Sequence, residues 1–246
     1  MTAALEARDV AKSYGLVRVL DGIDLSVSPG ELVAVLGPSG CGKSTLLRLL
    51  AGLEPPDAGR IEERGVRVIG PDPARPMVVQ GATLFPWLSL RANLEWGPRA
   101  FRRRDAAAIA DDLLDATGLT GFGDALPREL SGGMRQRAAI AQVLANDPPV
   151  LLLDEPFGAL DAQTRLRMQE WLAALLAERE TATVLVTHDV EEALLLGDEV
   201  VRLSHRPATV VERRRVEMEG RRDRRRLADP AFVAEKAELL NAVLEQ

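Results

Sequence analysis

Short apolar runs alternate with stretches of helical periodicity along this chain. The run Glu31–Leu36 is rich in Val and Leu and lies between Pro29-Gly30 and Gly37-Pro38, which predicts a buried strand. Leucines at helical spacing follow in Ser44–Leu53. A strand, a glycine-rich turn and a helix are therefore expected in immediate succession.

The same alternation returns in the second half of the chain. Strands are predicted at Met77–Gln80, Val150–Asp154 and Thr183–Thr187, and a helix at Gln163–Arg179. Such alternation predicts an α/β fold with a mostly parallel sheet that helices cover on both faces. The segment between Gln80 and Val150 is mostly helical and is expected to form an inserted subdomain. Its predicted helices are Ser89–Trp96, Arg103–Thr117 and Ser131–Asn146.

The C-terminal part begins with two short predicted strands, Glu199–Leu203 and Thr209–Glu212. An arginine-rich stretch, Arg213–Arg226, follows, and Asp229-Pro230 is a good start for a tail helix from Ala231 to Glu245. We expect a discontinuous core over residues 1–82 and 150–212, a helical subdomain over 83–149, and a C-terminal region over 213–246.

Composition narrows the class of protein. The 246 residues are 46% hydrophobic and 28% charged, so a buried core can form. The formal net charge of −6 argues against a surface that grips nucleic acid, and we expect no nucleic-acid partner. The single cysteine, Cys41, excludes an internal disulfide and fits a reducing compartment. No signal-peptide pattern and no apolar stretch of about 18 residues is present, so a membrane role must come through a partner.

The most informative motif is a phosphate-binding loop. Residues 37–44 fit G-x-x-x-x-G-K-[ST] between the predicted strand and helix, which disfavours an ordinary glycine-rich turn. Its backbone N–H groups and the helix N-terminus would bind phosphate, Lys43 would reach the β- and γ-phosphates, and Ser44 would bind Mg²⁺. We expect the Cys41 thiol to be acidic at this helix start and ATP to protect it from alkylation. The expected nucleotide-binding residues here are Gly37, Pro38, Ser39, Gly40, Cys41, Gly42, Lys43, Ser44 and Thr45.

Two carboxylates close the next apolar strand. Asp154 and Glu155 follow Val150–Leu153, at the strand end where α/β sheets carry out nucleotide chemistry. Asp154 would hold Mg²⁺ and Glu155 would act as general base for the attacking water. The alternative for an acidic pair at this position is a helix N-cap.

At this point the chain resembles the ATP-binding-cassette (ABC) ATPases. The run Leu130-Ser131-Gly132-Gly133-Met134-Arg135-Gln136-Arg137 looks like the signature motif of that family. Other matches occur in the family's order: Gln80 resembles the Q-loop glutamine, Ala159-Leu160-Asp161 the D-loop, and His188 the switch histidine, while Tyr14 lies where an aromatic residue commonly stacks on adenine. The resemblance covers about residues 5 to 210.

The resemblance implies further roles and partners. The expected fold is a P-loop NTPase core with antiparallel β elements near the N-terminus and the helical insertion. A head-to-tail dimer, with a second copy or a paralogous cassette, would sandwich two ATP molecules, and Ser131, Gly132, Gly133 and Asp161 would complete the partner's site. Gln80, with Ser44 and Asp154, would organise Mg²⁺ and water, and His188 would sense the γ-phosphate.

Finer matches suggest a branch within the family. The Leu84-Phe85-Pro86-Trp87 run and Ser204-His205-Arg206-Pro207 look most like the nitrate/sulfonate/taurine importers. Phe85–Trp87 would then receive integral membrane permease subunits, although local packing is the alternative. A periplasmic or lipoprotein solute-binding protein would act indirectly, and the chain would lie at the cytoplasmic face of the membrane as a peripheral subunit.

Two other functions stay open at this stage. A non-transport ABC ATPase acting on a soluble macromolecular partner typically carries two cassettes or a long insertion, for which 246 residues leave no room. A small-molecule kinase would leave the signature and His188 unexplained.

For Arg213–Arg226, interleaved acids favour a solvated, salt-bridged face over contact with lipid or a partner subunit.

Overall fold

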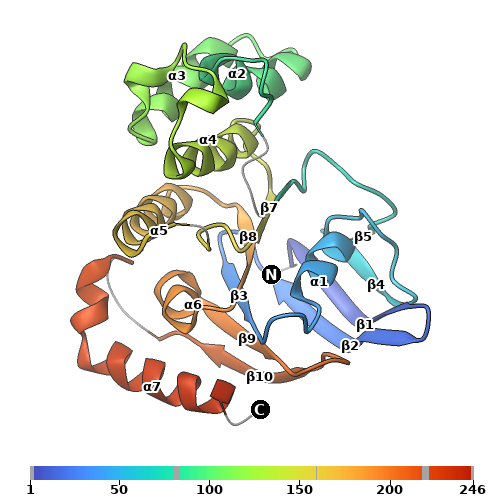
Figure 1. Cartoon of the computed structure of the whole chain (residues 1–246). Coiled ribbons are helices and arrows are strands. Elements are labelled where there is room, and N and C mark those ends of the chain that lie inside the picture. The colour runs from blue at the N-terminus through green and yellow to red at the C-terminus, as the bar shows by residue number, and fades with distance from the viewer. Residues whose placement is uncertain (1–2, 80–83, 159, 218–221, 245–246) are drawn as a thin grey trace.

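The computed structural model describes residues 3–79, 84–158, 160–217 and 222–244 (Figure 1). Its larger sheet has the order β10-β9-β3-β8-β7-β6. All neighbours are parallel except β10, which pairs antiparallel with β9 at one edge. The strands are β3 (Leu32–Leu36), β6 (Met77–Val78), β7 (Val150–Asp154), β8 (Ala182–Thr187), β9 (Glu199–Leu203) and β10 (Val210–Arg215). The predicted mostly parallel sheet is confirmed.

The smaller sheet is antiparallel and has the order β2-β1-β4-β5. It consists of β1 (Leu5–Tyr14), β2 (Val17–Val27), β4 (Ala58–Glu63) and β5 (Val66–Arg67), and it confirms the antiparallel elements expected near the N-terminus. A bridge between Leu20 and Ala208 connects β2 to the β9–β10 turn of the larger sheet. The two sheets therefore meet beside the phosphate loop.

Side chains that alternate along the central strands enter two separate cores. Val33 and Val35 of β3 pack with α1 (Lys43–Leu50) and the smaller sheet, whereas Ala34 and Leu36 pack with the helices on the other face. Those helices are α5 (Ala162–Ala177), α6 (Val190–Leu196) and α7 (Pro230–Leu244). Because both faces are covered, the buried strands read as continuous apolar runs, which is why the sequence showed them clearly.

A third core holds the helical insertion together. Helices α2 (Leu90–Ala100), α3 (Ala106–Ala116) and α4 (Gly132–Leu144) bury Leu90, Leu113 and Ala138, and Figure 1 shows them as a group above the two sheets. Short 3₁₀ turns, Thr120–Phe122 and Pro127–Glu129, connect α3 to α4. Ser89 and Ser131 cap α2 and α4, so the predicted starts of these helices lie at the capping residues themselves.

The C-terminal part differs most from the prediction at the end of β10. β10 continues to Arg215, three residues beyond the predicted end at Glu212, so Arg213, Arg214 and Arg215 belong to the sheet. After Val210 and Val211 the strand holds only charged residues, Glu212 to Arg215, which alternate between exposed and half-buried positions, so no apolar pattern marked its continuation past Glu212. A 3₁₀ turn, Arg224–Ala228, then precedes α7, whose Phe232 and Leu239 are buried against α6.

Candidate nucleotide site

The carboxyl ends of three adjacent strands place the predicted site residues at one edge of the larger sheet. Leu36 pairs with Thr187, and Asp154 pairs with Val186. The phosphate loop after β3, the acidic pair at the end of β7 and His188 after β8 are therefore neighbours. This is the edge at which open α/β sheets bind ligands.

The phosphate loop has the backbone that its glycines permit. Gly42 has φ +128°, and a Cβ there would approach side-chain atoms of Val19 and Leu20 at 2.9 Å. Gly40 has φ +76° and faces open space. The loop thus needs glycine at position 42 both for its conformation and for the close approach of β2.

The Lys43 ammonium group lies inside this loop. Its Nζ donates to the carbonyl oxygens of Gly37 and Pro38 at 2.7 and 3.0 Å, and the side chain is buried. Ser39 is exposed, whereas Thr45 is buried and its hydroxyl accepts a hydrogen bond from Arg48. A buried cation surrounded by backbone dipoles is a suitable receptor for a polyphosphate.

Ser44 and Asp154 form an oxygen pair. The Ser44 hydroxyl donates to Asp154 Oδ1 at 3.0 Å across 110 positions of sequence. Burial raises the pKa of Asp154, and the charge of Glu155 adds to this, whereas the Ser44 hydrogen bond and the cations Arg48 and Lys43 oppose it. A cation at this point would favour the ionised carboxylate.

Glu155 and His188 are in direct contact. His188 Nδ1 lies 3.1 Å from Glu155 Oε1, and the histidine side chain is half exposed. Glu155 has φ +44°, a conformation that costs a non-glycine residue energy, and its backbone N–H donates to Val186 O at 3.0 Å. The carboxylate is thus held at the sheet edge by a strained residue, as is common at functional sites.

The signature and D-loop residues occupy two helix starts. Ser131 accepts a hydrogen bond from Met134 N, and Asp161 accepts one from Thr164 N, which lowers the pKa of Asp161. Gly132 faces open space, whereas a Cβ on Gly133 would lie 2.8 Å from Thr164 Cγ2. The beginning of α4 therefore packs closely on the beginning of α5, while Ser131 and Gly132 remain exposed.

Tyr14 is placed at the end of β1, with its ring 42% exposed. Its hydroxyl hydrogen-bonds to Glu54 and lowers the pKa of that carboxyl, and Lys12 Nζ lies 5.7 Å from the ring centroid. Gln80 and Ala159 lie outside the described residues.

The acidity expected of the Cys41 thiol is wrong. Its side chain is only 2% exposed, and burial raises the pKa of the thiol, with Lys43 opposing the shift. Desolvation therefore outweighs the helix N-terminus. Alkylation of this thiol should already be slow without nucleotide.

Sequence reasoning missed a group of charged residues beside Glu155 and His188. A cavity of about 20 Å³ is lined by Glu155, Phe157, Gly158, Arg165, Thr187, His188, Asp189 and Glu192. Arg165 is on α5, and Glu192 is a buried carboxyl on α6. The only sequence signal was a charged residue within the apolar period of each helix. Among the described residues, no cluster of three or more His, Cys, Asp or Glu could hold a metal by itself.

Ring contacts and the side chain of Asn93 hold the aromatic segment that begins at Leu84. The Phe85 ring centroid lies 5.7 Å from that of Trp87 and 5.1 Å from that of Trp96. The fully buried Asn93 accepts from Phe85 N and donates to the carbonyl oxygens of Phe85, Leu88 and Ser89. Trp87 nevertheless remains 71% exposed.

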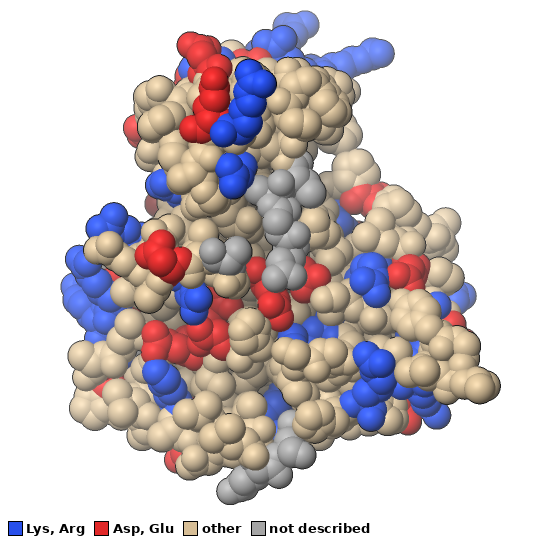
Figure 2. All heavy atoms as spheres, in the orientation of Figure 1, with Lys and Arg blue, Asp and Glu red and all other residues tan. Residues whose placement is uncertain are grey.

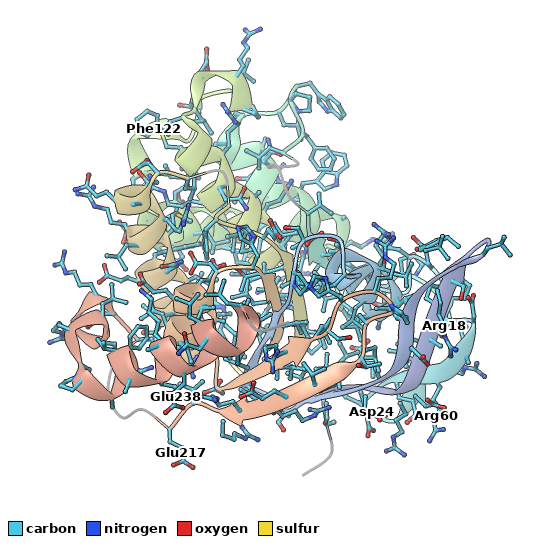
Figure 3. The ribbon with its side chains drawn as sticks, turned by 60° about the horizontal axis from the view of Figure 1, so that its bottom comes forward. Arg18, Asp24, Arg60, Phe122, Glu217 and Glu238 are labelled. Atoms are coloured by element: carbon cyan, nitrogen blue, oxygen red, sulfur yellow. The ribbon has the colours of Figure 1, made fainter. Side chains whose placement is uncertain are left out.

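The arginines described between positions 213 and 226 confirm the salt-bridged face. Arg213, Arg214 and Arg215 pair with Glu199, Glu238 and Glu31, and Arg222 pairs with Asp198. Figure 3 shows Glu238 on α7, on the side of β10, and Figure 2 shows charges of both signs intermixed over one face of the molecule. In the described part of the chain, none of the helices is long and apolar enough to cross a membrane.

Comparison with known proteins agrees with this geometry. The family model described as ABC transporter matches residues 20–158. The chain is 44% identical over 243 residues to the aliphatic sulfonates import ATP-binding protein SsuB 2 of Burkholderia lata, covering 98% of this chain and 86% of that protein. It is 48% identical to the taurine import ATP-binding protein TauB of Jannaschia sp. (80% of this chain, 74% of that protein). Identity to the nitrate import ATP-binding protein NrtD of Synechocystis sp. is 46% (88% and 84%).

Solved structures extend the comparison to the fold. The dimeric ATP-binding cassette MJ0796 in a post-hydrolysis state with ADP and Pi superposes with a TM-score of 0.75 at 29% identity, covering 87% of this chain and all of that chain. The resemblance seen in the motifs is confirmed by both kinds of comparison. The chain belongs to the ABC transporter family, as one of its ATPase subunits.

Proposed function

We propose that this chain powers an importer of small solutes of the nitrate, sulfonate or taurine type. The observation that carries the proposal is the convergence of phosphate loop, acidic pair and histidine at one sheet edge, in a chain 44–48% identical to import ATP-binding proteins. It would work as a peripheral subunit at the cytoplasmic face of a membrane permease.

The residues present fit a magnesium–nucleotide complex. Mg²⁺ commonly takes one or two protein oxygens and completes its shell with phosphate oxygens and water. The Ser44 hydroxyl and the Asp154 carboxylate are 3.0 Å apart beside the phosphate loop, which suits that donor set. Gln80 is proposed as a further ligand. The bound ion would neutralise charge on the β- and γ-phosphates.

Glu155 and His188 are proposed to divide the hydrolytic work. The Glu155 carboxylate would accept a proton from the attacking water, and His188, 3.1 Å away, would contact the γ-phosphate through its other ring nitrogen. Because Nδ1 faces Glu155, Nε2 is the atom left for the phosphate. The residues 37–45 would bind phosphates through backbone N–H groups and Lys43, and Tyr14 would stack on adenine.

A second copy, or a paralogous cassette, would complete each site. The exposed start of α4, with Ser131 and Gly132, offers a second set of N–H groups for an anion, and Asp161 lies close by at the start of α5. Gly133 would support this surface through its contact with Thr164. The core would comprise residues 1–82 and 150–212, with 83–149 as the signature subdomain and 213–246 as a C-terminal region.

The aromatic segment Phe85–Trp87 is proposed as the contact for the permease. Asn93 fixes its backbone while Trp87 stays 71% exposed, a combination that suits a preformed docking surface. A solute-binding protein outside the membrane would choose the substrate and act on this chain only indirectly.

The test is affinity capture of the full tagged chain from solubilised membranes of its source. Co-purification of a multispanning protein, and ATPase activity that taurine, a sulfonate or nitrate stimulates through the associated binding protein, are the expected results. Trp87→Ala should lose the membrane partner, whereas Phe122→Ala, an exposed aromatic outside the segment (Figure 3), should keep it. Recovery of only ribosomal or DNA-associated partners would instead support a non-transport ATPase.

A further inference from the structure

Arg165 connects two turns that the proposed mechanism treats separately. From the first turn of α5, its guanidinium donates to the carbonyl oxygen of Leu160 at 3.1 Å and to Asp189 Oδ2 at 3.3 Å. Leu160 adjoins the α5 cap Asp161, and Asp189 adjoins His188. The Arg165 side chain thus joins the Leu160-Asp161 turn to the His188-Asp189 turn.

Asp189 passes this contact on to the histidine turn. Its Oδ1 accepts from Glu191 N and Glu192 N at 2.9 and 3.2 Å, and its own N–H donates to Thr187 Oγ1 at 3.0 Å. The residues on both sides of His188 are therefore bound to the same short network. A shift of the Asp189 carboxylate would move the backbone from which His188 projects.

A second contact one helical turn along keeps α5 in register with α6. Gln169, four residues after Arg165, donates to the buried Glu192 at 3.4 Å. The Gln169–Glu192 contact joins only α5 and α6. Arg165 also reaches the carbonyl oxygen of Leu160, in the turn before α5. The cavity lined by Glu155, Arg165 and His188 lies directly beside it.

The other end of the connection begins at the signature helix. Gly133 packs against Thr164, the residue before Arg165, and Arg165 N donates to Asp161 O at 2.8 Å. The starts of α4 and α5, which would meet the partner, are thus in continuous contact with the His188 turn of the same chain.

We propose that Arg165 is a positioning residue for ATP hydrolysis, which couples the Leu160-Asp161 turn to the orientation of His188. The inference rests on the proposed roles of Glu155 and His188. Arg165 binds no nucleotide in this scheme. It keeps the histidine turn in its active arrangement when the α5 start is engaged by a second copy.

The test compares Arg165→Gln with Arg167→Gln, a substitution of an exposed arginine on the same helix. Arg165→Gln should lower kcat about 3- to 30-fold, leave KM for ATP within about twofold, and still allow ATP-dependent dimerisation in a Glu155→Gln background. Arg165→Lys, which keeps the charge, should recover part of kcat. Arg167→Gln should match the unsubstituted protein.

A double-mutant cycle separates positioning from simple helix packing. Asp189→Asn keeps an oxygen that can cap α6 but removes the charge that faces Arg165, so its effect on kcat and that of Arg165→Gln should be strongly non-additive. Additive effects, an unchanged kcat, or a loss of kcat matched by a loss of folded protein in thermal melts would each overturn the proposal. If Arg165→Gln does not fold, the single variants Arg165→Lys and Asp189→Asn decide it by the same kcat-against-KM comparison.

His188→Ala distinguishes the failure of this inference from that of the proposed mechanism. If His188→Ala hydrolyses ATP at the full rate, the proposed role of His188 is wrong, whatever Arg165 does. If His188→Ala is inactive and Arg165→Gln is fully active, only the coupling through Arg165 is refuted.

Discussion

The carboxyl group of Glu192 should make the stability of this protein depend on pH. The side chain is 4% exposed between α5 and α6. Burial, with a smaller contribution from the charge of Asp189, raises its pKa from the ordinary 4.5 to about 7, and hydrogen bonds from Thr187 and Gln169 and the charge of Arg165 only partly oppose this. The folded chain therefore keeps Glu192 protonated at a pH where the unfolded chain ionises it.

The sign and size of the effect follow from this shift. Below pH 4.5 both states are protonated and no penalty exists. As the pH rises from 4.5 to about 7 the unfolded state releases its proton first, so stability falls, and above about 7 the loss is constant. At 1.36 kcal/mol per pKa unit the whole loss is about 3 kcal/mol, most of which develops between pH 5 and pH 8.

Glu192→Gln removes the titration and keeps a side chain of the same shape. Relative to the unsubstituted protein, the variant should gain about 2 kcal/mol more at pH 8 than at pH 5, which for a chain of this size is a difference of about 4 to 8 °C in Tm. Thermal melts or urea titrations at both pH values measure it. Glu191→Gln is the control, because Glu191 is half-exposed and pairs with Lys236. An equal gain at pH 5 and pH 8 for Glu192→Gln would refute the reasoning.

Three further predictions concern the nucleotide site. Glu155→Gln should slow ATP hydrolysis about 10²- to 10⁴-fold and accumulate an ATP-bound dimer in size-exclusion chromatography; rapid turnover would remove Glu155 as general base. Ser44→Ala should raise the Mg²⁺ concentration needed for half-maximal ATPase activity, whereas Ser44→Thr should not. Gly42→Ala should destabilise the fold by about 2 kcal/mol in urea titrations, more than Gly40→Ala, because only the Cβ at position 42 meets other atoms at 2.9 Å.

Local patterns carried much of the architecture and the chemistry. Glycines followed by Lys43 and Ser44 between an apolar strand and a helix specify a phosphate loop by sequence alone, since each residue type has a local reason to be there. Ser131, predicted at a helix start, caps α4 because its short side chain satisfies a free N–H group, and Asp161, predicted only as a D-loop residue, caps α5 in the same way. The buried strands β3, β7 and β8 were equally legible, as continuous apolar runs.

Other features were decided only when distant segments met. The acidity expected of Cys41 was wrong because burial depends on β9 and the loop packing around the thiol, which no local pattern reports. The polar edge strand β10 pairs its arginines with acids up to 184 positions away, so its extent followed from those partners. Arg165, Asp189 and Glu192 come together only through the packing of α5 on α6, and their positions in the sequence do not predict this contact.

The sequence by itself thus determined which groups bind phosphate, because that chemistry is built within one strand–turn–helix unit. The tertiary structure decided how Asp154, Glu155 and His188 face that unit, because the register of three parallel strands sets their separation. It also decided the protonation of the buried carboxyl Glu192, since desolvation and neighbouring charges are properties of packed elements and not of any single segment.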